Sequence, residues 1–275
     1  MTLGQITGVP ILDYHRIVPA GRTAVRGDRF AVQEVEFRRH LELLRDLKIK
    51  VVATSDIAAG RLHSNRHHGN AQREPGLPAP SVALTFDDGY ASHYEVAFRL
   101  LAEFGVSGTF FVITSRVGTG EFLDWGMAAE MVRAGMSFGS HAHHHVVLTT
   151  LGTDRLQEEL RVSRQILEQR LACAIEVLAV PYGFCDQHVL DAAWESGYSV
   201  VCTSRPWPAQ VGDRVLPRVA VSQQTSMGEL RKLVERDAAV YLRRWGRDRA
   251  LAIPRYVFVR LKPEILGVRT AEDSV

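Results

Sequence analysis

The sequence is poor in cysteine and has no long apolar run. Its three cysteines, Cys173, Cys185 and Cys202, are an odd number and lack the paired spacing of a metal finger. We therefore expect reduced thiols and a cytoplasmic protein rather than a disulfide scaffold. No apolar stretch approaches the roughly 20 residues that cross a bilayer. Residues 1–9 lack the basic start and the apolar core of a secretory signal, so we expect none.

A large excess of charge of one sign is also absent. The chain carries 33 basic and 31 acidic residues, for a net charge of +2, which implies no general polyanion partner. No glycine-rich phosphate loop is present, and we expect no nucleic-acid partner. The remaining composition, 46% hydrophobic over 275 residues, is that of a globular protein. This length suits a single α/β barrel, which takes about 250 residues.

Short apolar runs alternate with helical patterns along the chain. The apolar runs predict strands at residues 9–13, 50–53, 81–86, 107–113, 136–140, 176–180, 198–202 and 215–221. The helical patterns predict helices at residues 35–47, 55–60, 94–104, 127–134, 154–171, 187–196 and 227–245. This alternation favours a parallel sheet covered by helices, either a barrel or a doubly wound sheet. Residues 61–80 show no periodicity and are rich in His, Arg, Asn, Gly and Pro, which predicts a mobile surface insertion.

Two adjacent carboxylates follow the apolar run at residues 82–86. Asp87 and Asp88 precede Gly89, at the point where a buried strand reaches the rim of a sheet or barrel. Neighbouring side chains of an extended chain point to opposite sides, so one carboxylate can bind a metal while the other faces the substrate. The alternative is a plain Asp-Asp-Gly turn.

A histidine cluster follows a second apolar run. His141 and His145 are four residues apart, so on one helical turn they share a face and can hold one ion. His143 and His144 remain alternative ligands, and an exposed His-rich turn is the alternative to a metal site. One Asp with two His is the ligand set of a catalytic zinc-like site with an open position. The pattern therefore indicates a metal-dependent hydrolase.

Three motifs occur in a characteristic order. They are Thr85-Phe86-Asp87-Asp88-Gly89, then Ser140-His141 with His145 and Leu148, then Pro181-Tyr182-Gly183. Together they resemble the NodB-type polysaccharide deacetylases, the fourth carbohydrate esterase family. The resemblance implies an α/β fold, a distorted (β/α) barrel of about seven strands. We expect residues 1–225 to form this domain, and residues 226–275 to form a C-terminal helix and basic tail packed on the barrel.

The resemblance also implies residue roles. A divalent metal, most often zinc but also cobalt or nickel, would be held by Asp88, His141 and His145. Asp87 would be the catalytic base. The backbone N–H of Tyr182 would stabilise the oxyanion, with Pro181 and Tyr182 also contacting the substrate.

The proton donor and the arginine differ from the common family pattern. The usual donor is a late histidine, but the last histidine of this chain is His188. Residues 11–16 contain a Tyr-His pair that resembles the subgroup with permuted strand order, which predicts His15 as the general acid. The third motif lacks its usual opening arginine, and we expect Arg218 to orient the base instead, with a surface salt bridge as the alternative. Trp125 is predicted to stack on a sugar ring, or else to pack in the core.

The C-terminal segment is basic. Residues 231–262 contain ten Arg and Lys against three acids, interleaved with Trp245, Tyr256 and Phe258. This pattern predicts either peripheral contact with an anionic membrane or an ordinary solvated helix face.

The expected function is removal of an N-acetyl or similar acyl group from an amino sugar. The sugar would belong to a polysaccharide, a glycolipid or a glycan precursor, reached in the cytoplasm or at the inner membrane surface. The alternatives are a deformylase of a lipid-linked amino sugar, a sugar O-deacetylase, and a non-catalytic glycan-binding barrel.

Overall fold

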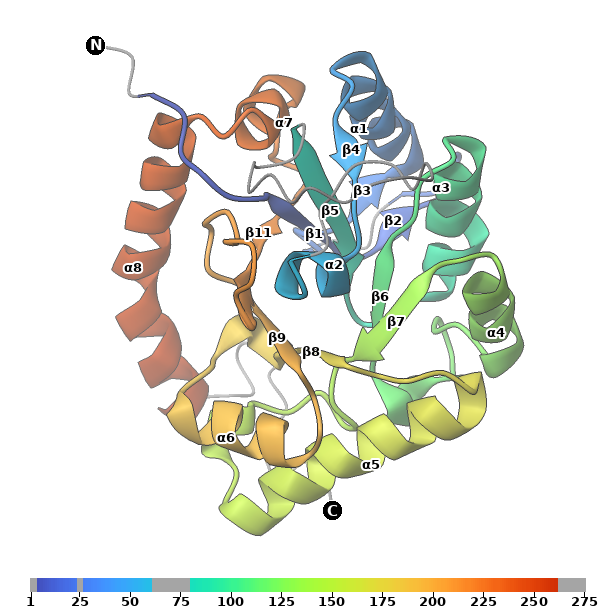
Figure 1. Cartoon of the computed structure of the whole chain (residues 1–275), viewed down its shortest axis with the longest axis vertical. Helices are drawn as coiled ribbons and strands as arrows, with labels where there is room; N and C mark the ends of the chain where they lie inside the picture. Colours follow the sequence, from blue (N-terminus) through green and yellow to red (C-terminus); the bar gives the residue numbers. More distant parts are fainter. Residues whose placement is uncertain (1–3, 24–26, 61–79, 262–275) are drawn as a thin grey trace, which may run out of the picture.

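Parallel strands and helices alternate along the chain; nine strands form a sheet that curves into a barrel, and two short strands form a separate sheet (Figure 1). The computed structural model describes residues 4–23, 27–60 and 80–261, with the backbone alone for 251–261. The strands are β1 (Ile11–Tyr14), β2 (Ile17–Val18), β3 (Val32–Gln33), β4 (Lys50–Val51), β5 (Ser81–Phe86), β6 (Thr109–Val112), β7 (Ser137–Ser140), β8 (Val177–Ala179), β9 (Val200–Thr203), β10 (Val215–Pro217) and β11 (Val219–Ala220). The α-helices are α1 (Glu34–Asp46), α2 (Thr54–Ala58), α3 (Arg99–Glu103), α4 (Trp125–Arg133), α5 (Thr153–Leu171), α6 (Gln187–Glu195), α7 (Met227–Val234) and α8 (Ala238–Leu261).

The sheet closes through a strand segment that changes partner at one residue. β10 pairs with β9, β11 pairs with β1, and only Arg218 separates β10 from β11. The order around the sheet is β10-β9-β8-β7-β6-β5-β1-β11, with every pairing parallel, and β4 pairs with the first residues of β5. With β10 and β11 taken as one strand and the short β4 left out, seven strands surround the barrel, as predicted.

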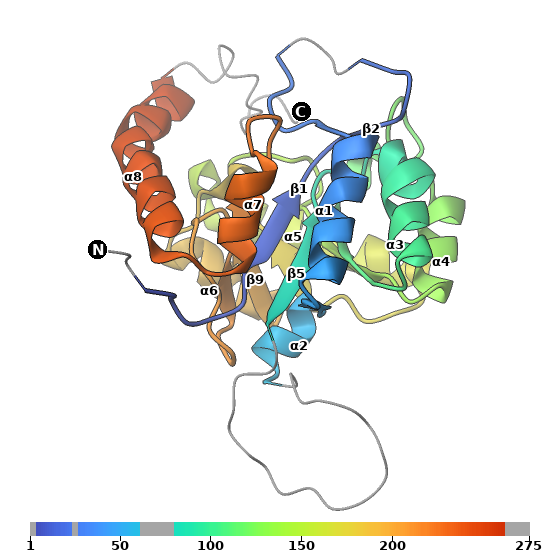
Figure 2. The ribbon, with the colours of Figure 1, turned by 90° about the horizontal axis from the view of Figure 1, so that it is seen from above.

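The hydrophobic core has an inner and an outer layer because successive side chains of a strand point to opposite faces. On β1, Ile11 belongs to the cluster inside the barrel, whereas Leu12 and Tyr14 belong to the larger cluster shared with the covering helices. α2 lies at the end of the barrel where the strands begin, and its Ile57 joins the inner cluster (Figure 2). The opposite end, where the strands finish, is left for polar side chains.

The C-terminal helices pack on the barrel near its closing strand. Val219 of β11 forms a buried cluster with Leu233 of α7 and with Val240 and Tyr241 of α8. The prediction of one helix over residues 227–245 was wrong, because Arg236 adopts a left-handed φ of 63° and separates α7 from α8. Within the described part of the chain, none of the helices has the length and apolar character needed to span a membrane.

Other predicted boundaries also shift. The strand predicted at 50–53 ends at Val51, because Ala53 is the N-cap of α2. The helix predicted at 94–104 begins with a π-helical stretch, His93–Phe98, and continues as α3. The short pair β2 and β3 was not predicted. Nearly all of the predicted insertion at 61–80, and the tail from 262 to 275, lie outside the described residues.

Candidate metal centre and active site

The predicted site residues gather at the carboxyl ends of the barrel strands. Asp87 and Asp88 follow β5, His141 follows β7, and Tyr182 lies three residues after the end of β8. His15 follows β1. The carboxyl ends of parallel strands meet at one rim of a barrel, so these segments converge although they are far apart in the sequence.

Asp88, His141 and His145 form a cluster with the geometry of a metal site. Oδ1 of Asp88 lies 3.3 Å from Nε2 of His145 and 3.6 Å from Nε2 of His141. Ligands about 2.0–2.2 Å from a tetrahedral zinc ion are separated by roughly 3.3–3.6 Å, so this spacing fits the ion. Among the described residues, Oδ1 of Asp88 is buried without a hydrogen-bond donor, which also fits a metal ligand.

The two histidines are prepared for metal binding by their surroundings. Nδ1 of His141 lies 2.8 Å from the carbonyl oxygen of Ala179, so this nitrogen carries the proton and leaves Nε2 a free lone pair. Burial lowers the pKa of His145 to about 3, which keeps its imidazole neutral, as a ligand must be. Burial alone would raise the pKa of Asp88, but the neighbouring imidazoles of His145, His15 and His141 outweigh burial and lower it.

The expectation that His141 and His145 share a helical turn was wrong. Residues 141–145 form a loop in which Ala142 and His145 have left-handed φ angles of 63° and 60°. Asp88 and Tyr182 are also left-handed, at 77° and 59°. Such angles are uncommon for residues other than glycine and persist only where the surroundings impose them, as functional sites often do.

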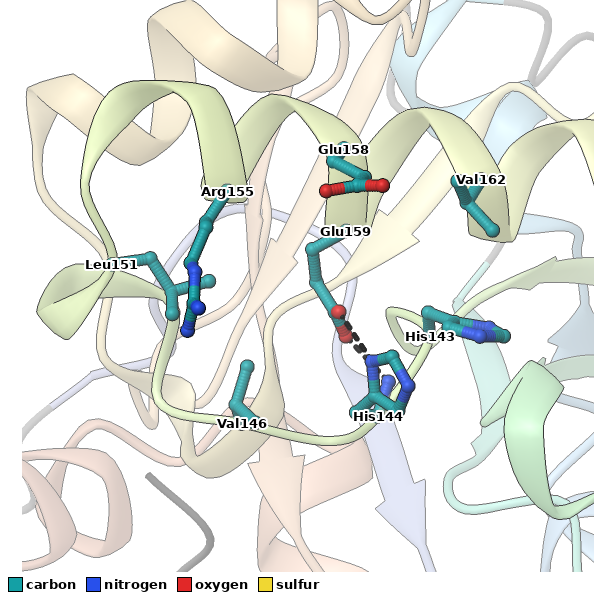
Figure 3. Close-up of a pocket in the computed structure, with 8 residues that line it drawn as sticks. All are labelled: His143, His144, Val146, Leu151, Arg155, Glu158, Glu159 and Val162. Atoms are coloured by element: carbon teal, nitrogen blue, oxygen red, sulfur yellow. Dashed lines mark hydrogen bonds and ion pairs between the residues drawn. The ribbon is translucent and has the colours of Figure 1, made fainter. Parts of the chain in front are cut away.

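His143 and His144 point away from the metal cluster, which removes them as alternative ligands. Nδ1 of His143 lies 2.7 Å from the hydroxyl of Thr114, and Nδ1 of His144 lies 2.8 Å from Oε2 of Glu159. Both imidazoles line a separate cavity of about 340 Å³ between the loop and α5 (Figure 3). The loop therefore presents His141 and His145 to one side and His143 and His144 to the other.

Asp87 is held by Arg218, as the sequence predicted. Nη1 and Nη2 of Arg218 each donate a hydrogen bond of 2.7 Å to a different oxygen of Asp87. Burial would raise the pKa of Asp87, but Arg218 and then His141 outweigh burial and lower it. Arg218 is fully buried and also contacts Thr85 and the carbonyl oxygen of Thr203, so the surface salt bridge is excluded.

Asp13 is a site residue that the sequence reasoning missed. Its Oδ1 lies 3.3 Å from Nη1 of Arg218 and 3.9 Å from Nδ1 of His15, inside the barrel. Burial raises the pKa of Asp13 to about 7, although the positive charge of Arg218 lowers it. Asp13, His15 and Asp87 are close enough to hold an ion, but the guanidinium of Arg218 already provides their cation. The sequence did offer one sign of this role, because Asp13 is the single acidic residue in the apolar run at residues 9–13.

His15 lies at the edge of this buried network. Its ring stacks on Phe30 at a centroid distance of 4.8 Å, and its backbone carbonyl lies 2.7 Å from Nε2 of His93. Burial would lower the pKa of His15, but the carboxylates of Asp13, Asp88 and Asp87 outweigh burial and raise it. The imidazole is thus close to carboxylates that favour its protonated form.

Tyr182 reaches the site, whereas Trp125 has other contacts. The Tyr182 ring lies 4.6 Å from that of His145, and the turn that carries Tyr182 begins with Pro181. Trp125 is the first residue of α4; it packs against the outer core cluster, and the guanidinium of Arg170 lies 5.8 Å from its ring. These contacts correspond to the core-packing alternative for Trp125.

Comparisons with known proteins agree with this geometry. The model of the polysaccharide deacetylase family matches residues 75–201. The Bacillus subtilis (strain 168) protein YxkH, which carries the name of a polysaccharide deacetylase, is 26% identical over 216 residues, or 78% of this chain and 71% of that protein. The poly-β-1,6-N-acetyl-D-glucosamine N-deacetylase of Staphylococcus aureus (strain MRSA252) is 25% identical over 162 residues, 53% of this chain and 56% of that relative's length.

Solved structures of deacetylases share the fold. IcaB from Ammonifex degensii superposes with a TM-score of 0.70 and 26% identity, covering 84% of this chain and 98% of that one. The Streptococcus pyogenes deacetylase PplD, solved in complex with acetate, gives a TM-score of 0.71 at 24% identity, covering 83% and 98%. The fold and the rim of carboxylates and histidines define a metal-dependent hydrolase of the NodB-type barrel class. Residues 75–201 match the model of the polysaccharide deacetylase family, and the fold is similar to that of solved deacetylases.

Proposed function

We propose that this protein hydrolyses the N-acetyl group of an amino sugar within a polysaccharide or glycan. The observation that carries the proposal is the cluster of Asp88, His141 and His145 beside Asp87, whose two oxygens are bound by buried Arg218. The Staphylococcus aureus relative is named for poly-β-1,6-N-acetyl-D-glucosamine, which makes that polymer the first substrate to test.

The metal proposed for the site is zinc, with cobalt and nickel as alternatives. The ligand set of one carboxylate and two imidazoles, whose Nε2 atoms lie 3.3 and 3.6 Å from Oδ1 of Asp88, supports this choice. When bound, the metal would polarise the acyl carbonyl and lower the pKa of the attacking water.

The residues around the metal ligands would move the protons. Asp87 accepts the proton of the attacking water, and Arg218 keeps the carboxylate ionised and fixes its orientation. His15, whose pKa is raised by its carboxylate neighbours against the effect of burial, donates a proton to the leaving amine. The backbone of Tyr182, in a turn next to His145, stabilises the negative charge that develops on the acyl oxygen.

Acetate release tests the proposal. Metal-stripped protein, protein reloaded with zinc, cobalt or nickel, and an Asp87→Asn variant are compared on N-acetylglucosamine oligomers with β-1,6 and β-1,4 links. We expect release by the reloaded protein and its loss in Asp87→Asn with metal content unchanged. Release of formate instead of acetate from formylated sugars would assign a deformylase, and acetate from O-acetyl sugars alone an O-deacetylase. Metal binding without turnover on any acylated sugar would assign a glycan-binding barrel.

We further propose that the protein works in the cytoplasm, at the inner face of an anionic membrane. Leu242 and Trp245 lie on the outer side of α8 with 43% and 42% of their surfaces exposed, and the guanidinium of the exposed Arg249 lies 4.9 Å from the Trp245 ring. α8 runs beside the barrel toward the rim at which the strands finish (Figure 2). Apolar and basic side chains on one helix face suit an interface with anionic lipid. The three free cysteines support a reducing compartment.

Vesicle flotation tests the membrane contact. We expect binding to vesicles that contain phosphatidylglycerol, weakened by salt and by Trp245→Ser. Val211→Ser, which removes an apolar side chain of similar exposure (40%) elsewhere, is the matched control. Equal binding to neutral vesicles, or no effect of Trp245→Ser relative to the control, would contradict the proposal.

A further inference from the structure

Helix α5 holds the histidine loop from its outer side. Glu159 and Ser163 are one helical turn apart on α5, and both are buried, with 7% and 0% of their surfaces exposed. The hydroxyl of Ser163 lies 2.7 Å from that of Ser140, and Ser140 Oγ accepts a 3.0 Å hydrogen bond from the backbone N–H of Ala142. One turn of α5 thus contacts the beginning of the loop through Ser163.

Glu159 holds the other part of the loop by binding one residue twice. Its Oε1 accepts a hydrogen bond from the backbone N–H of His144, and its Oε2 lies 2.8 Å from Nδ1 of the same histidine (Figure 3). Residue 144 directly precedes His145, a member of the metal cluster. The carboxylate therefore fixes both the main chain and the side chain next to a ligand.

The loop conformation needs such a restraint. Ala142 and His145 have left-handed φ angles, which cost about 1 kcal/mol or more each for residues with a Cβ. On the side of α5 the loop borders the cavity of about 340 Å³ lined by His143, His144, Arg155 and Glu158, among others. Close packing does not fill this side, so the loop has room to relax toward α5 if the contact with Glu159 is lost.

We propose that Glu159 is a positioning residue for the metal, acting through His144 to keep His141 and His145 converged on Asp88. The inference rests on the metal-dependent function proposed above. Removing a group that orients metal ligands from outside the coordination sphere commonly weakens metal affinity by 10–100-fold. The same variant should lose much less of its turnover once the metal is saturating.

The test measures zinc affinity by competition with a chromophoric chelator. We expect Glu159→Ala to bind zinc about tenfold or more weakly, with His144→Ala showing a smaller loss because the backbone N–H still reaches Glu159. Glu159→Gln, which retains one acceptor oxygen, should lie between Glu159→Ala and the wild type. Glu158→Ala is the matched control, because Glu158 lines the same cavity on the same helix but is exposed.

Urea unfolding of the metal-free variants separates positioning from stability. A Glu159→Ala protein with wild-type zinc affinity would overturn the inference, however unstable that protein is. Equal weakening by Glu158→Ala would assign the effect to charge alone and would also overturn it. If Glu159→Ala does not fold, the zinc affinities of Glu159→Gln and His144→Ala are compared with that of the wild type instead, and wild-type affinity in both would overturn the inference. A wild-type protein that binds zinc but releases no acetate would reject the proposed reaction alone, whereas one that binds no metal would reject this inference too.

Discussion

Arg218 is the residue on which the buried charges of the barrel depend. It is fully buried between Asp87 and Asp13, and it is the guanidinium that compensates both carboxylates. A buried charge that loses its partner is strongly destabilising, so removal of the guanidinium should destabilise the fold, above all through Asp87. The network therefore serves the fold as well as the proposed chemistry.

Arg218→Lys should change the pH dependence of catalysis. A lysine ammonium cannot bind both oxygens of Asp87 in the way the planar guanidinium does. Weaker stabilisation of the carboxylate raises the pKa of Asp87, so the acidic limb of the kcat/KM profile should move to higher pH. We also expect kcat/KM at neutral pH to fall on the order of a hundredfold, because the base is misplaced.

The measurement is the pH profile of the zinc-saturated protein. Arg214→Lys is the control, because the Arg214 guanidinium stacks 4.0 Å from the Trp194 ring in a separate contact. An acidic limb that stays in place in Arg218→Lys would exclude Arg218 as the group that lowers the pKa of Asp87.

His15→Ala should remove turnover but not metal. His15 is not among the three residues of the metal cluster, and loss of a general acid typically lowers the rate by 10²–10⁴-fold. The acid must be protonated to act, and the pKa of His15 is raised, so activity of the wild type should persist above pH 6.5. Zinc content and kcat are measured together across pH. Loss of zinc in proportion to activity would contradict the assignment.

At the scale of elements, strands end in recognisable motifs, whereas loop conformations do not. The carboxylates after β5 and the histidines after β7 could be found because an apolar run ends where the polar residues begin. The left-handed angles of Ala142 and His145 were not predictable, since such angles are uncommon for any residue other than glycine. Asp13 was missed because its contact with Arg218 depends on how β11 pairs with β1, which local sequence does not show.

Gly139→Ala should disturb the strand that carries His141. A Cβ at Gly139 would lie 2.5 Å from Cε1 of Phe111 and 2.7 Å from the carbonyl oxygen of Val177, which is too close for the barrel interior. Overpacking of this kind costs about 1–3 kcal/mol in the free energy of unfolding. We also expect weaker zinc binding, because β7 must shift at the residues just before His141.

Gly228→Ala in α7 provides the comparison for this substitution. A Cβ there meets no atom within 4 Å, so replacement should leave stability unchanged or raise it by up to about 1 kcal/mol. Urea unfolding and zinc titration of both variants make the measurement. Equal stability of the two variants would contradict the packing argument.

At the scale of the whole molecule, a buried histidine links stability to pH. His40 of α1 is 2% exposed, its Nδ1 lies 3.1 Å from the hydroxyl of Tyr14, and burial lowers its pKa to about 4. The unfolded chain binds the proton near pH 6.5, so the stabilising contribution is present above that value and is lost as the pH falls toward 4.

His40→Gln should therefore flatten the pH dependence of unfolding. For the wild type, we expect His40 to account for a loss of about 2 kcal/mol in the free energy of unfolding between pH 7 and pH 5. Urea unfolding of metal-free protein at both pH values measures this loss, and the variant lacks it. The same slope in both proteins would show that His40 does not titrate as its burial implies.

The barrel is closed by the strand segment that changes partner at Arg218, and this segment is synthesised after all the other barrel strands. A ribosome makes Asp13 and Asp87 long before it makes residues 215–220. Until then, the nascent chain contains both carboxylates but lacks the guanidinium that contacts them in the folded barrel. The edge of β1 that pairs with β11 also has no partner. The last barrel strand brings closure and the missing positive charge in the same step. A chain truncated before this strand therefore lacks the guanidinium that binds both oxygens of Asp87.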